Sequence, residues 1–135
     1  MWYYDNTLYD EVPKEYIGFV YLITDLPTNK MYVGKKLFWN TRKLKPLKGK
    51  ARRRIQVVES DWKTYYGSNE ELQQLVENSH AERFEREILY LCAKKGEMSY
   101  LEAKEQFDRN VLLSDEYYNN FIGCKIHGKH VAGLR

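Results

Sequence analysis

Short apolar runs separated by turn-forming polar segments organise the first part of this chain. The segment 18–25 (GFVYLITD) is dominated by β-branched and aromatic residues, which is typical of a strand. Residues 25–30 (DLPTNK) have the composition of a turn, and a second strand is expected at Met31–Gly34 (MYVG). Two strands with so short a connection predict an antiparallel hairpin.

The second half of the chain predicts two helices and one more strand. Ser68 and Glu71 have capping-box spacing ahead of apolar residues at helical spacing, so a helix is expected to begin at Ser68. The segment 84–91 (FEREILYL) predicts a third strand, and 99–112 predicts a long helix. Residues 1–16 predict an irregular lead-in. The expected fold class is α+β, with a small three-stranded antiparallel sheet flanked by helices.

Length and composition place the chain in a single domain. It has 135 residues, and its twelve tyrosines, five phenylalanines and three tryptophans supply enough apolar surface for one compact core. No apolar run approaches the roughly 20 residues of a membrane span. The two cysteines predict neither a disulfide framework nor a zinc site. We therefore expect one domain over residues 1–135 and no membrane contact.

Positive charge is concentrated in one insert, at about residues 35–63, directly after the second predicted strand. Ten basic residues and no carboxylate occupy 35–58, whereas the rest of the chain holds 12 basic residues against 19 acidic ones. Such an insert predicts a binding place for a polyanion, the alternative being a solvated loop. We expect an ordered loop around a short helix. The predicted DNA contacts are Lys35, Lys43, Lys48, Lys50, Arg52, Arg53, Arg54 and Ser68.

Several residue types in the chain suit metal-assisted cleavage of a phosphodiester. Tyr21 and Tyr32 lie on adjacent predicted strands, Arg42 opens the basic insert, and Glu102 and Glu105 lie on the last helix. A carboxylate holds a divalent cation, and a guanidinium stabilises charge on the phosphate. A phenol accepts a proton from water if nearby positive charge lowers its pKa.

At these residues the chain resembles the GIY-YIG nucleases. FVY at 19–21 and YVG at 32–34, whose tyrosines are eleven residues apart, resemble the paired motif of that family. The resemblance covers a core of about residues 18–122. It is closest to free-standing phage homing-type (Seg-like) endonucleases, through the KK pair after YVG, LKGK at 47–50 and ESDW at 59–62.

The resemblance implies a role for each residue of the motif. Tyr21 would activate the water, Tyr32 would orient the phosphate or water, and Arg42 would act on the phosphate. Asn119 would support the site. Lys36 is the first candidate for a third group in proton transfer, because Pro46 stands where some relatives have a histidine.

A glutamate of the last helix would bind the single metal ion, Mg²⁺ or Mn²⁺. Glu102 is the first choice and Glu105 the second. Ser99 and Glu102 also have capping-box spacing, and a glutamate in that role needs no metal. Phe19 replaces the first glycine of the family motif, a position that takes no part in the chemistry.

The resemblance implies a metal-dependent DNA endonuclease of the homing or mobile-element type, located in the cytoplasm of a bacterial host. A catalytically inactive nucleic-acid-binding module of the same fold is the first alternative, and a small basic interaction protein is the second. Only 16 residues follow Asn119, too few for a separate recognition domain. Sequence selection would then come from the insert, from a homodimer or from a separate partner.

Overall fold

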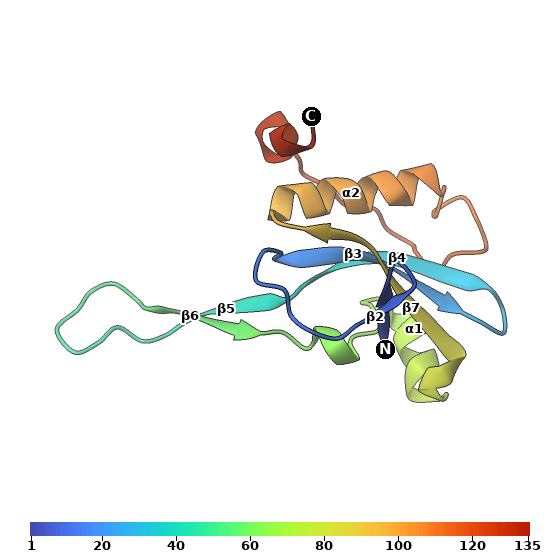
Figure 1. The fold of residues 1–135 in the computed structure, drawn as a ribbon, viewed down its shortest axis with the longest axis horizontal. Coiled ribbons are helices and arrows are strands. Elements are labelled where there is room, and N and C mark those ends of the chain that lie inside the picture. The colour runs from blue at the N-terminus through green and yellow to red at the C-terminus, as the bar shows by residue number, and fades with distance from the viewer.

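A five-stranded mixed sheet lies between two helical layers in the computed structural model, which describes all residues 1–135 (Figure 1). Its strand order is β2–β1–β7–β3–β4, and β5 and β6 form a separate two-stranded sheet. The strands are β1 (Trp2–Tyr4), β2 (Thr7–Tyr9), β3 (Gly18–Asp25), β4 (Lys30–Leu37), β5 (Trp39–Lys43), β6 (Ile55–Glu59) and β7 (Phe84–Cys92). The helices are α1 (Glu70–Glu77) and α2 (Lys95–Asp108), with 3₁₀ turns at Trp62–Thr64, Ala81–Arg83 and Gly128–Leu134.

The expected antiparallel hairpin and third strand are confirmed at the centre of the sheet. Strand β3 pairs antiparallel with β4 on one side and with β7 on the other. The expected three-stranded sheet is too small, because residues 1–16 are not an irregular lead-in. They form a β1–β2 hairpin, and β1 adds to the sheet parallel to β7. Trp2 anchors this addition, since its ring is buried and its indole nitrogen donates to the carbonyl of Trp62 at 2.7 Å.

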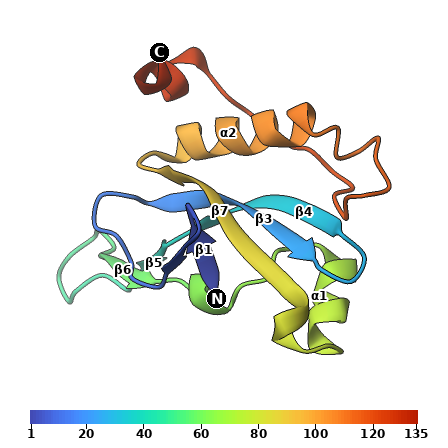
Figure 2. The ribbon, with the colours of Figure 1, turned by 45° about the vertical axis from the view of Figure 1, so that its right-hand side comes forward.

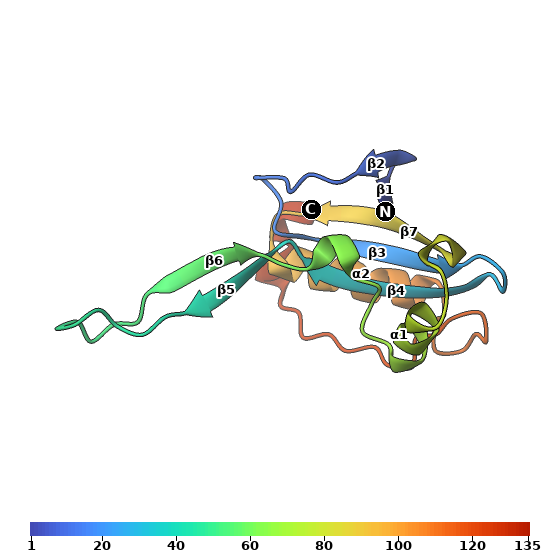
Figure 3. The ribbon, with the colours of Figure 1, turned by 90° about the horizontal axis from the view of Figure 1, so that it is seen from below.

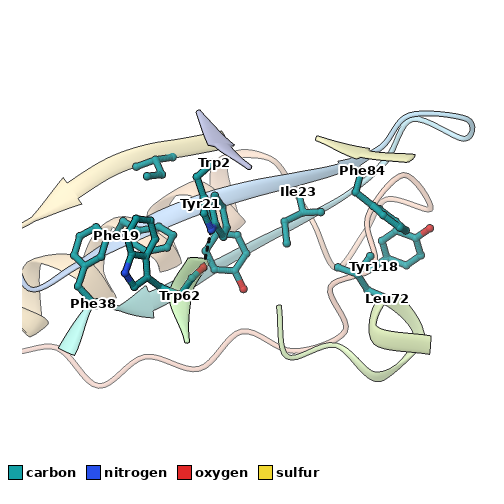
Figure 4. Close-up of a cluster of buried hydrophobic side chains, with 10 residues drawn as sticks. Trp2, Phe19, Tyr21, Ile23, Phe38, Trp62, Leu72, Phe84 and Tyr118 are labelled. Atoms are coloured by element: carbon teal, nitrogen blue, oxygen red, sulfur yellow. Dashed lines mark hydrogen bonds between the residues drawn. The ribbon is translucent and has the colours of Figure 1, made fainter. Parts of the chain in front are cut away.

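Each face of the sheet carries its own apolar cluster. Helix α2 covers one face, while α1 and the 3₁₀ turn at Trp62–Thr64 lie against the other (Figures 1 and 2). The face beneath α1 is rich in aromatic rings, and Figure 4 shows Tyr21 between Phe19 and Ile23 along β3. Phe19, at the glycine position of the family motif, is fully buried in this cluster.

The basic insert is not a loop around a short helix but a β-hairpin. Strands β5 and β6 pair antiparallel and project from the body, as Figures 1 and 3 show. The β-branched segment Ile55–Glu59 supplies one strand. The connecting segment between Lys43 and Ile55 turns at Gly49, which has a positive φ of 85°. We call Trp39–Glu59 the basic arm.

Both helices begin elsewhere than the capping patterns predicted. The N-cap of α1 is Asn69, whose side chain accepts from the amide of Leu72 at 3.0 Å, so Ser68 is free for another contact. Helix α2 begins and ends four residues earlier than expected. Ser99 therefore lies inside the helix and caps nothing. Neither helix combines the length and apolarity that a bilayer crossing requires.

Candidate active site

Two glycines make room for the paired phenols at the outer strand of the sheet. Tyr21 lies opposite Gly34 in the β3–β4 register, and a Cβ at Gly34 would collide with the Tyr21 hydroxyl. A Cβ at Gly67 would lie 3.4 Å from the same hydroxyl and 3.2 Å from the ring of Tyr32, and Gly67 has a φ of 92°. The YVG motif and the glycine before α1 therefore allow both phenols to share one small space.

Tyr21 is buried and its phenol is protonated at neutral pH. Its side chain is 1% exposed, with the rings of Trp2, Tyr32 and Tyr65 around it at centroid distances of 5.3, 6.2 and 6.0 Å. Burial, with smaller contributions from the neighbouring phenols and from Glu102, raises the pKa of Tyr21 well above its ordinary value. The expectation that positive charge lowers this pKa is not met by the chain's own residues.

Tyr32 lies nearer the surface and shares a hydrogen bond with Ser68. The distance between the Tyr32 hydroxyl and Ser68 Oγ is 3.0 Å, and either atom can donate. Burial raises the pKa of Tyr32, although the bond to Ser68 lowers it in part. Because Ser68 is exposed, this hydrogen bond connects the hydroxyl of Tyr32 to solvent.

Lys36 is a cation on the aromatic side of the site. Its Nζ lies 2.6 Å from Asp61 and 4.1 Å from the centroid of the Tyr65 ring, which itself contacts Tyr21 edge-on. Asp61 is exposed, and Lys36 holds the pKa of its carboxyl below the usual range. The Asp61 side chain is 68% exposed and that of Lys36 18%, so an outside anion such as a phosphate reaches Lys36 from the Asp61 side.

Glu102 is a largely buried carboxylate with few partners. Its side chain is 13% exposed, and its nearest cation is Lys35, whose Nζ lies 3.9 Å away. That ammonium donates instead to Ser99 Oγ at 2.8 Å. Burial raises the pKa of Glu102, and Lys35 only partly offsets this. The carboxylate also raises the pKa of Tyr21 and Tyr32, so it acts within the same electrostatic environment.

Glu105, the second choice for a metal ligand, is bound by other side chains. One oxygen accepts from the Tyr90 hydroxyl at 2.7 Å, and the other accepts from Arg109 Nε at 2.8 Å. Burial raises the pKa of Glu105, but these two hydrogen bonds outweigh it and the net shift is downward. Of the two carboxylates, Glu102 is the one whose oxygens accept no hydrogen bond from the protein, with Lys35 Nζ at 3.9 Å as its nearest cation.

The donor set fits a divalent cation held by one carboxylate. No three His, Cys, Asp or Glu side chains gather anywhere in the chain. Mg²⁺ keeps several waters and is commonly held by one or two carboxylates together with substrate phosphates. An almost unpartnered, buried carboxylate such as Glu102 suits this arrangement because its ionised form otherwise lacks compensation.

Asn119 supports the site through the backbone of β4. Its side-chain oxygen accepts from the amide of Val33 at 3.0 Å and its nitrogen donates to the Val33 carbonyl at 2.8 Å. Val33 lies between Tyr32 and Gly34, so this buried amide fixes the strand that carries the motif. The observed role of Asn119 is therefore to hold the backbone of the strand that carries both Tyr32 and Gly34.

The structure does not bring Arg42 to the phenols. Arg42 lies in β5 of the basic arm, opposite Gln56, with an exposed side chain. Pro46 lies further out, in the connecting segment of the same arm.

The predicted DNA contacts divide into two groups. Ser68 is bonded to Tyr32 and Lys35 lies beside Glu102, whereas Lys43, Lys48, Lys50, Arg52, Arg53 and Arg54 belong to the arm.

Arg86 is a positioning residue that the sequence reasoning missed. It lies in β7 and donates from Nη1 to the carbonyl of Tyr65 at 2.8 Å, while its guanidinium lies 4.1 Å above the Tyr66 ring and 4.6 Å from the Trp2 ring. It is 3% exposed, and burial lowers its pKa. The alternation of residues along this strand places Arg86 at an inward-facing position, and this pattern could have indicated that the arginine is buried.

Fold and site together define a small α+β domain with a phenol, carboxylate and lysine site at one sheet edge, suited to phosphate chemistry. A family model described as "Putative endonuclease segE, GIY-YIG domain" matches residues 2–122. The chain belongs to this family and is an endonuclease, a hydrolase that acts on phosphodiester bonds in DNA. GIY-YIG nucleases generally depend on a divalent metal. Neither curated proteins nor solved structures give a significant match.

Proposed function

We propose that this endonuclease cuts DNA through Tyr21, Lys36 and Glu102, and that it is of the homing or mobile-element type found in phage. The convergence of these groups at the β4 edge carries the proposal. Tyr21 and Tyr32 share the space left by Gly34 and Gly67, and Glu102 lies within electrostatic reach of both phenols.

In this proposal Glu102 holds the divalent cation, Mg²⁺ or Mn²⁺. The bound ion supplies charge that polarises the phosphate and acidifies water. When the substrate complex supplies the positive charge that the free chain lacks, the Tyr21 phenol first loses its own proton, and the resulting phenolate accepts a proton from the attacking water. The proton that Tyr21 loses passes to solvent by way of Tyr32, whose hydroxyl is hydrogen-bonded to the exposed Ser68.

Lys36 takes the role expected of Arg42. Its ammonium leaves Asp61 and stabilises the developing charge on the scissile phosphate. Lys35, bound to Ser99, keeps positive charge beside Glu102 and the DNA backbone. Both lysines follow YVG directly, so the motif strand itself presents them at the sheet edge.

Plasmid cleavage by two matched variants tests the proposal. Glu102→Gln and Glu105→Gln make the same change one helical turn apart in α2. With supercoiled plasmid and Mg²⁺ or Mn²⁺, Glu102→Gln should slow cleavage on the order of 10³-fold, because metal binding contributes several kcal/mol of transition-state stabilisation. Glu105→Gln should retain the wild-type rate.

The controls separate the alternatives. EDTA should abolish cleavage by the wild-type protein. The Tyr21→Phe variant should not cleave the plasmid either, although its melting temperature should equal that of the wild type. DNA binding without cleavage by the wild-type protein at any metal concentration would favour the inactive binding module. Equal cleavage by wild type and Glu102→Gln would refute the assignment of the metal ligand.

A further inference from the structure

The basic arm carries positive charge that nothing in the protein neutralises. Eight cations lie between Trp39 and Glu59, and Glu59 is the only carboxylate of that segment. None of the eight takes part in any of the seven ion pairs of the structure, whereas Lys35 and Lys36 of the body are both paired. The arm therefore presents free charge to a polyanion outside the molecule.

One face of the arm carries side chains of the types that recognise DNA bases in other proteins. Arg42 lies directly opposite Gln56, and Asn40 lies directly opposite Val58. Because residues two apart on a strand share a face, all four belong to one side of the ribbon. Arginine pairs with guanine, and asparagine and glutamine pair with adenine, each through two hydrogen bonds.

The opposite face of the arm is different in chemistry. It carries Thr41 opposite Val57 and Lys43 opposite Ile55. Thr41 and Val57 also line a groove of about 460 Å³ against Ile17 of the body, and Asn40 reaches the same groove. Arg42 and Gln56 do not line it and are both exposed, so these two side chains are the ones that stand free for an outside partner.

We propose that the basic arm enters the major groove of duplex DNA with Arg42 and Gln56 toward the bases, and so selects the sequence that is cut. This inference rests on the proposed function, since it takes duplex DNA as the substrate. The major groove of B-DNA is about 12 Å wide and admits a two-stranded ribbon. The projecting hairpin in Figure 3 has that form. The deep, narrow major groove of RNA does not admit it.

Charge and base contacts have separate places on this arm. The cations of the connecting segment lie beyond the paired strands and meet phosphates on either side of the groove; they are Lys45, Lys48, Lys50, Arg52, Arg53 and Arg54. Phosphate contacts raise affinity for every sequence, whereas base contacts discriminate. Arg42 is then a specificity residue and not part of the cleavage machinery.

Selection from a randomised duplex library tests the inference. The protein with the Glu102→Gln change binds the library without metal, and bound sequences are compared with those bound by the same protein carrying Arg42→Lys. We expect the parent to prefer guanine at one position by about 5- to 150-fold. Arg42→Lys keeps the charge but loses the bidentate contact, so this preference should disappear while the salt dependence of binding is unchanged.

Two further variants complete the comparison. Lys48→Ala should weaken binding to all sequences equally and reduce the salt slope by about one, with the guanine preference intact. Thr41→Ala, on the opposite face, should change neither quantity. The library selection measures binding without metal and does not depend on cleavage. Its result can therefore be interpreted even if the proposed cleavage chemistry is wrong.

Three outcomes would overturn the inference while leaving metal-dependent cleavage standing. One is no base preference in the parent protein. Another is the same preference in Arg42→Lys. The last is tighter binding of single strands or of duplex RNA than of duplex DNA.

Discussion

Two carboxylates of this molecule have opposite environments, although both are largely removed from water. Asp25, at the end of β3, accepts two hydrogen bonds from Arg83 at 2.6 and 2.8 Å and one each from Thr28 and Tyr118. Glu102, beside β4, has one cation at 3.9 Å and no hydrogen-bond donor. Hydrogen bonding from Arg83 holds the pKa of Asp25 to about 2, whereas burial raises the pKa of Glu102.

This difference in compensation gives the two carboxylates different roles, one in stability and one in binding a cation. At Asp25 the charge is fully compensated, so ionisation stabilises the fold. At Glu102 the charge is poorly compensated, so ionisation costs stability in the free protein. A cation that binds at Glu102 recovers this cost, which makes the under-partnered carboxylate the better ligand.

The largest expected effect comes from Asp25→Asn. Removing the charge leaves Arg83 without its buried partner, and the free energy of unfolding should fall by about 3 kcal/mol. Chemical denaturation measures this, and cleavage per folded molecule should be retained. Asp108→Asn, which breaks only the exposed pair with Lys104, should cost less than about 0.5 kcal/mol. Equal losses in the two variants would contradict the comparison.

The pH dependence of Asp25 follows from the same measurement. A carboxyl with a depressed pKa contributes stability above its ordinary value of 3.8, and that contribution is lost as the pH falls toward about 2. The wild-type protein should therefore lose stability over this window. Asp25→Asn should show a shallower loss there, and an unchanged slope would show that other carboxylates govern acid unfolding.

A smaller effect is expected from Gly34→Ala, which tests the space around the phenols. The added Cβ meets the Tyr21 hydroxyl and lies 3.0 Å from the Tyr32 ring, so overpacking should cost roughly 1–3 kcal/mol. Cleavage should fall as well, because both phenols must move. Gly128→Ala, whose nearest neighbour is 3.6 Å away, is the control and should change neither stability nor cleavage.

The smallest effect distinguishes the two glutamates of α2 by stability alone. Glu105→Gln weakens hydrogen bonds from Tyr90 and Arg109 and should cost about 1–2 kcal/mol. Glu102→Gln removes a poorly compensated charge and should keep or raise the melting temperature. Thermal melts at neutral pH measure both, and a reversed order would mean that Glu102 is the structural carboxylate.

Local patterns were sufficient for the centre of the fold. The β3–β4 hairpin and β7 follow from short apolar runs with a clear turn, and the fold class is α+β as expected. Strand β1 could not be predicted from local patterns because its three residues pair with β7, more than eighty positions away in the sequence. The β-branched Ile55–Glu59 segment did carry a strand signal, but its cationic neighbours pointed to a loop.

The site was predictable only where family motifs mark it. Tyr21, Tyr32 and Glu102 were predicted as site residues; the structure packs the two phenols against each other, with ring centroids 6.2 Å apart, and the site assignment itself stays a prediction. Arg42 was assigned to the site because it follows the YVG motif in the sequence. That position in the sequence cannot reveal that the insert is a projecting hairpin. Within α2, Phe107 is 60% exposed, whereas Gln106 is buried and donates to the Val33 carbonyl at 3.1 Å.

The parallel pairing of β1 with β7 sets a condition on the order in which a ribosome makes this enzyme. Trp2 leaves the ribosome well before its neighbour Arg86 and the helix that bears Glu102. Long-range pairings of this kind form late in folding. Nascent chains therefore carry an unfinished sheet until Arg86 and this helix have been made, and the capacity to break DNA arises only after that.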